Sequence, residues 1–149
     1  MKHLTKIDKY IFLKHTADIK FQAFGKTPEK CFENAAYALK KILAGEKEKI
    51  KSVKTKKISC GGNDFGSLLY NFLEEFLFLL DSKNFVFSKI SKMNIKILKQ
   101  GYKITAEISG DNSKNYKLKT HIKAITYNDM FVKFDNKSKI YSCQVVVDV

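Results

Sequence analysis

Two segments with helical periodicity constrain the fold of this chain most strongly. In the first, Thr27 and Pro28 precede apolar residues that recur every three or four positions, and Gly45 follows the last of them. This order is typical of an N-cap, a first-turn proline and a terminating glycine. In the second, Asp64 precedes a wide apolar stripe over residues 65–80. Each predicted helix has one apolar face, so each must pack against another layer of structure.

Extended segments surround these two helices. Residues 18–23 alternate strictly between apolar and polar side chains, as expected for a strand with one buried face. Further strands are predicted over residues 10–13, 85–99, 102–109, 120–134 with a turn at Asn128-Asp129, and 140–149. The order of strands, helix, strand, helix and strands predicts a single α+β domain over residues 1–149, with both amphipathic helices packed on a largely antiparallel sheet. A chain of 149 residues is long enough to bury such a core.

Charge is the unusual feature of the composition. The 28 basic residues are all lysine and stand against 15 acidic residues, which gives a net charge of +13. Lysine can neutralise phosphates, but base-specific contacts are usually made by arginine, so sequence-specific DNA recognition is not expected. The densest run, residues 45–57, is interpreted as a solvated, charged edge strand in preference to an RNA-binding groove.

Several classes of protein are excluded by the same composition. A hydrophobic fraction of 44% argues against a disordered chain, and no apolar run reaches the ~20 residues that a membrane helix needs. The first residues resemble no signal peptide, so we expect a cytoplasmic protein without a membrane partner. Cys31, Cys60 and Cys143 are too few and too widely spaced for a disulfide framework or a zinc site, and we expect them to be reduced.

One cysteine stands where a reactive thiol is conceivable, shortly before the second helix. Cys60 stands shortly before that helix, where the helix dipole favours a thiolate, and His15 or His121 could serve as its base. A structural cysteine is the preferred interpretation, because no spacing links these residues. The following Gly61-Gly62-Asn63 is interpreted as a turn and not as a phosphate-binding loop, since it lacks the pattern of either common motif.

Four motifs, taken in order, resemble the archease family. They are Phe12-Leu13-Lys14-His15-Thr16-Ala17-Asp18-Ile19, the helical segment from Asp64 to Leu77, Lys123-Ala124-Ile125-Thr126-Tyr127, and the terminal Val145-Val146-Val147-Asp148-Val149. The resemblance extends over essentially the whole chain from Tyr10, which makes residues 1–149 an archease-like domain.

The resemblance implies a protein cofactor and not an enzyme. Proteins similar to this one assist an RtcB-type tRNA-splicing RNA ligase, and archease promotes guanylylation of the ligase and its multiple turnover. RNA would then be met indirectly, through the ligase. By the motif matches, Asp18 and Asp148 would be metal-associated acids, and Lys123 would be a further residue needed for ligase activation.

The last two residues of the sequence independently favour a metal site. The side chain of Asp148 lies next to the carboxylate that Val149 carries where it ends the chain. If the turn at Asp18 meets this end, several hard oxygen donors converge. Such donors suit Ca²⁺ best, with Mg²⁺ or Mn²⁺ as alternatives, and they disfavour zinc.

Two other functions remain open at the level of sequence. One is a lysine-rich RNA-binding or chaperone-like module without metal-dependent activity, which would bind RNA with a steep dependence on salt. The other is a small metal-dependent hydrolase, although the sequence shows no clear nucleophile or base for it.

Overall fold

The computed structural model describes residues 8–13 and 17–149 of the chain. His15, one of the two histidines considered as a base for Cys60, therefore lies outside the described residues. In chain order the elements are β1 (Tyr10–Leu13), β2 (Ile19–Gly25), α1 (Pro28–Ala44), β3 (Lys54–Gly62), α2 (Phe65–Lys83), β4 (Phe85–Ile97), β5 (Tyr102–Asn112), the short 3₁₀ helix η1 (Ser113–Asn115), β6 (Ala124–Asp135) and β7 (Ile140–Asp148). The predicted α+β class is confirmed.

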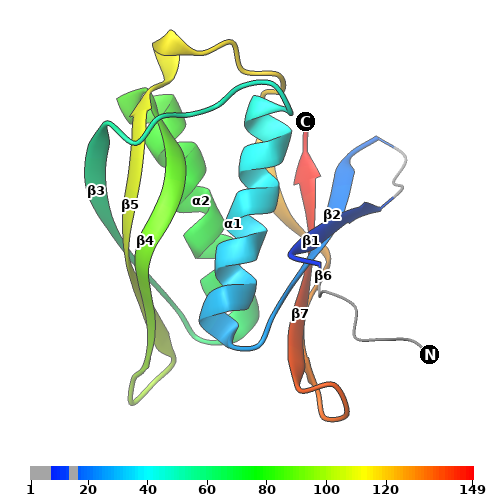
Figure 1. The fold of residues 1–149 in the computed structure, drawn as a ribbon. Coiled ribbons are helices and arrows are strands. Elements are labelled where there is room, and N and C mark those ends of the chain that lie inside the picture. Colours follow the sequence, from blue (N-terminus) through cyan, green and yellow to red (C-terminus); the bar gives the residue numbers. More distant parts are fainter. Residues whose placement is uncertain (1–7, 14–16) are drawn as a thin grey trace, which may run out of the picture.

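The strands form two antiparallel sheets where the sequence predicted one. The first has the strand order β1-β2-β7-β6 and the second has the order β3-β5-β4. Both helices lie between the two sheets (Figure 1). Helix α1 can occupy this position because its buried surface is wide. The small residues Ala35, Ala36 and Ala38 are fully buried, as are the larger Phe32 and Leu39. One apolar cluster therefore connects both helices with both sheets.

The predicted start and end of α1 and the predicted start of α2 are confirmed, whereas α2 continues beyond the predicted stripe to Lys83. The hydroxyl of Thr27 accepts the N–H of Lys30 at 3.1 Å, and Pro28 is the first residue of α1. Gly45 ends the helix with a φ of 79°, a left-handed conformation that glycine adopts without strain. Asp64 caps α2 as the sequence indicated.

Two local predictions require correction. Asn128 and Asp129 do not form a turn between two strands: β6 runs through them, with a shift in its register against β7 between Thr126 and Phe131. The amide of Gln144 holds this irregular stretch by donating to the carbonyl oxygen of Asp129 at 2.8 Å. In addition, Gly61 and Gly62 are the last residues of β3 and not part of a turn.

The lysine-rich strand lies at the edge of its sheet, as predicted, but it begins only at Lys54. Its register runs from Lys54 opposite Gly110 to Gly62 opposite Tyr102. No helix within residues 8–13 and 17–149 is both long and apolar enough to cross a membrane.

Candidate functional site

The predicted acids Asp18 and Asp148 meet at one end of the first sheet. Ile19, the first residue of β2, pairs with Val147 of β7. Asp18 directly precedes Ile19 and Asp148 directly follows Val147, so both acids lie at the end of the sheet where this last pair of β2 and β7 stands. The tertiary structure thus brings together two carboxylates that lie at opposite ends of the sequence.

The third predicted residue, Lys123, joins the same end of the sheet from β6. Its backbone N–H donates to the carbonyl oxygen of Asp148 at 2.8 Å, and the next residue, Ala124, pairs with Asp148 in the register of β6 and β7. The side chain of Lys123 is exposed. The end of β7 therefore lies between the starts of β2 and β6, with Asp148 on β7 and Asp18 and Lys123 directly before the other two strands.

The two carboxylates have no cationic partner among the described residues. Both are half-buried, and neither takes part in a hydrogen bond or an ion pair through its side chain within that part of the chain. The nearby lysine of β2, Lys20, pairs instead with Asp129 at 3.2 Å. Carboxylates that lie at the same end of a sheet without a cationic partner are candidate oxygen ligands for a bound cation.

Val149 follows Asp148 and is half-buried, with its side chain packed against the apolar core. Within residues 8–13 and 17–149, no three His, Cys, Asp or Glu side chains gather closely enough to hold a metal. Cation binding at this end of the sheet would therefore use the two aspartates together with backbone oxygens and water.

Glu74, a residue to which the sequence assigned no role, helps to position this site. Glu74 of α2 accepts the backbone N–H of Ile125 at 3.3 Å, so the helix holds the start of β6 directly after Lys123. Tyr70, one turn earlier, stacks on Tyr127 with ring centroids 4.2 Å apart. In the sequence, Glu74 could have been noticed as a charged residue within a strongly apolar helix.

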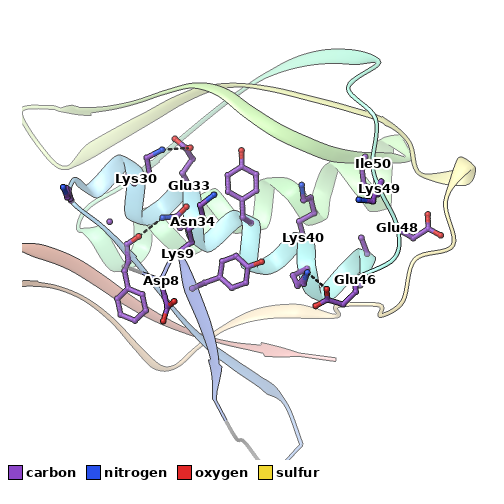
Figure 2. A pocket seen from close by; sticks show the side chains of 18 residues that line it. Asp8, Lys9, Lys30, Glu33, Asn34, Lys40, Glu46, Glu48, Lys49 and Ile50 are labelled. Atoms are coloured by element: carbon purple, nitrogen blue, oxygen red, sulfur yellow. Dashed lines mark hydrogen bonds and ion pairs between the residues drawn. The ribbon is translucent and has the colours of Figure 1, made fainter. Parts of the chain in front are cut away.

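A larger hollow lies elsewhere. A groove of about 890 Å³ follows α1 and is also lined by residues 8–10, by residues 24–26 at the end of β2 and by the segment before β3; Figure 2 shows the side chains that line it. Its charges are largely compensated: Lys30 pairs with Glu33 at 3.3 Å and Lys41 with Glu46 at 3.0 Å. Burial lowers the pKa of Lys40, which donates to the carbonyl oxygen of Ser88.

A smaller recess of about 370 Å³ is lined by Phe12 and Ile19 of the β1–β2 pair, by Lys41, Ile42, Gly45 and Glu46 at the end of α1, and by Lys119 and Thr120. Neither Asp18 nor Asp148 lines it. Because successive side chains of an extended segment point to opposite faces, the recess that Ile19 lines is on the other side of the sheet from the Asp18 carboxylate.

The structure supports the preferred, structural interpretation of Cys60. The residue lies within β3, four residues before the cap of α2, and is half-buried. Burial, together with the nearby Glu75, raises its pKa to about 11, so the thiol stays protonated at neutral pH. Cys31 and Cys143 are buried and, like Cys60, carry free thiols.

Comparison with known proteins gives a consistent result. The profile of the archease protein family matches residues 10–149. The chain is 38% identical over 143 residues to "Protein archease" of Methanosarcina barkeri, covering 95% of this chain and 96% of that protein. It is 35% identical over 127 residues to "Protein archease" of Thermococcus kodakarensis, covering 84% and 88%. The solution structure of Methanobacterium thermoautotrophicum protein 1598 superimposes with a TM-score of 0.80 at 27% identity, covering 95% of this chain and 99% of that one. With motifs, fold and relatives in agreement, the chain belongs to the archease protein family.

Proposed function

We propose that this protein is a cytoplasmic cofactor of an RtcB-type tRNA-splicing RNA ligase, promoting guanylylation of the ligase and its multiple turnover without being a catalyst itself. A divalent cation held by Asp18 and Asp148 would be required for this activation. The observation that carries the proposal is the register of β2 and β7, which pairs Ile19 with Val147 and so brings the adjoining, half-buried Asp18 and Asp148 to the same end of the sheet, with no cationic partner in the described residues.

The donor chemistry of this pair fits a hard cation. Ca²⁺ takes six to eight oxygen ligands and tolerates irregular geometry, so carboxylates, carbonyls and water can complete its shell. Where Val149 ends the chain, its carboxylate would add a donor beside Asp148. Structural zinc needs about four nitrogen or sulfur ligands, and no such cluster occurs in the described residues. We therefore favour Ca²⁺, with Mg²⁺ or Mn²⁺ as alternatives.

Each residue has a distinct part in the proposed activation. When bound, the cation would supply positive charge at the nucleotide site of the ligase, where phosphoryl transfer develops negative charge. Asp18 and Asp148 would hold that charge at the end of the sheet. Lys123 is exposed, and its backbone N–H donates a hydrogen bond to the carbonyl oxygen of Asp148; its side chain would contact a phosphate group. Glu74 would keep Lys123 in place by holding the start of β6.

The test is guanylylation of an RtcB-type ligase under multiple-turnover conditions, with and without this protein. We expect Asp18→Asn and Asp148→Asn each to abolish the stimulation, because removing one charge of the pair weakens cation binding. Asp129→Asn is the matched control: it removes a carboxylate that pairs with Lys20 on the same sheet but leaves the candidate pair intact. Stimulation by both site variants at the level of the unchanged protein would contradict the proposal.

Calorimetric titration with Ca²⁺ tests the cation site independently of the ligase. Asp18→Asn and Asp148→Asn should each weaken the binding measured for the unchanged protein, whereas Asp129→Asn should leave it unaltered. Adding a residue after Val149 should also weaken it, by moving the terminal carboxylate. Equal Ca²⁺ affinity in all of these proteins would show that Asp18, Asp148 and the terminal carboxylate do not hold the ion.

A further inference from the structure

The outer face of the second sheet carries a regular array of polar side chains. Three rows of cross-strand partners run from β3 through β5 to β4: Lys57-Glu107-Lys92, Ser59-Thr105-Asn94 and Gly61-Lys103-Lys96. We refer to these nine residues as the lysine face. Eight of them are exposed, and Glu107 is half-buried.

The orientation of these rows follows from their neighbours. Ile58 of β3, Ala106 of β5 and Met93 of β4 form a row that alternates with them, and all three belong to or pack against the apolar core. Because successive side chains of a strand point to opposite faces, the lysine face points away from that core. Both helices lie on the core side of this sheet, and none of the described helices or strands covers the other side (Figure 1).

The charges of the lysine face are not balanced within the described residues. It holds four lysines and one carboxylate, and none of the three ion pairs in that part of the chain involves them. Lys96 and Lys103 are direct cross-strand partners. Like charges in this position destabilise a sheet, so the pair is best accommodated when an anion lies over it.

The remaining side chains indicate what kind of anion fits. Ser59, Thr105 and Asn94 place hydroxyl and amide groups between the lysines. Lysine, serine, threonine and asparagine are among the side chains that contact phosphate and sugar groups of nucleic acids. No apolar or aromatic residue occurs among the nine, so the face lacks the buried anchors that dominate the energetics of protein interfaces.

We propose that the lysine face binds the phosphodiester backbone of an RNA strand without reading its sequence. The choice of RNA over DNA rests on the proposed function, whereas the contact with a phosphate backbone rests on the charges and polar groups of the face. Activation of the ligase through Asp18 and Asp148 and binding of RNA through the second sheet would then use different sheets of the same molecule.

The experiment measures binding of a fluorescein-labelled oligouridylate by fluorescence anisotropy over a series of salt concentrations, with no ligase present. Binding should weaken with salt by about 0.7 logarithmic units per decade for each phosphate neutralised. The double variant K96Q/K103Q should therefore have a slope shallower by about 1.4. The matched control K133Q/K137Q removes the same charge from exposed positions of the β6–β7 hairpin and should keep the slope of the unchanged protein.

Three results would overturn this proposal. The first is that the unchanged protein binds no oligouridylate. The second is that the salt dependence of binding becomes shallower by the same amount in both double variants, which would mean that the charge acts diffusely. The third is that K96Q/K103Q binds RNA normally but no longer stimulates guanylylation, which would make the face a contact for the ligase. Guanylylation without RNA keeps the two proposals apart, because K96Q/K103Q should retain the stimulation that Asp18→Asn and Asp148→Asn lose.

Discussion

Asp64 shows at the scale of a single residue how the sequence sets a local structure. Its carboxylate accepts the N–H of Ser67 at 2.8 Å, and the Ser67 hydroxyl accepts the N–H of Asp64 at 3.3 Å. This reciprocal pair satisfies two backbone donors at the start of α2 that have no partner within the helix. The hydrogen bond from the Ser67 backbone is also the main reason why the pKa of Asp64 is lowered.

Asp64→Ala should reduce the free energy of unfolding by about 1 kcal/mol, the usual cost of losing an N-cap. Asp64→Asn should keep most of the cap, because asparagine also accepts the bond, but should remove its titration. The folded-state pKa of Asp64 is depressed, so its contribution is present above about pH 4 and is lost as the pH falls through the folded-state value. Urea unfolding at neutral and acidic pH tests this. The free energy of unfolding should fall less on acidification in Asp64→Asn than in the unchanged protein, and equal falls in these two proteins would contradict the prediction.

At the scale of the elements, the junction between β3 and α2 depends on two glycines with different surroundings. A Cβ atom on Gly62 would lie 2.5 Å from the backbone nitrogen of Leu68, so the strand can approach the helix only without a side chain there. A Cβ atom on Gly66 would have nothing nearer than the Asp64 carboxylate at 3.6 Å, an ordinary contact. The same substitution should therefore have opposite effects at the two positions.

Gly62→Ala should destabilise the protein by about 1–3 kcal/mol, because the backbone of α2 must move. Gly66→Ala should stabilise it by about 0.5–1 kcal/mol, because alanine restricts the unfolded chain and favours the helix. The midpoint of urea unfolding measures both effects. A Gly62 variant as stable as the unchanged protein would mean that the close approach of strand and helix is not required.

At the scale of the whole molecule, the apolar core lies between two sheets and includes both helices. Phe72 of α2 is fully buried and contacts Phe32 of α1, with ring centroids 6.4 Å apart, and Phe76, at 5.1 Å. Phe78 lies on the same helix but is 52% exposed. The two phenylalanines thus differ in their place within the fold and not in their chemistry.

Phe72→Ala should lower the free energy of unfolding by about 3–5 kcal/mol, through lost burial and the cavity left behind. Phe78→Ala should change it by less than about 1 kcal/mol, as expected for an exposed position. Thermal unfolding followed by circular dichroism provides the comparison. Similar losses for the two variants would show that α2 is not packed between the sheets as described.

Both boundaries of α1 and the start of α2 could be predicted because their signals are local. Thr27, Pro28 and Gly45 act on the backbone within one helical turn of themselves, and each occupies the predicted position. The division of the strands into two sheets could not be predicted, since strand partners are chosen by contacts between distant segments. The irregular stretch of β6 was missed for the same reason: Gln144, on another strand, holds Asp129.

The sequence by itself determined the two amphipathic helices, the α+β class, the charged edge strand and, through its motifs, the family. It also named Asp18, Lys123 and Asp148, but it could not show that they meet. Only the tertiary structure decided that β7 pairs with β2 on one side and β6 on the other, which brings the three residues to one end of the sheet. It likewise decided that lysines from three strands form one face. Local patterns select an element, whereas the register between distant strands selects which side chains become neighbours.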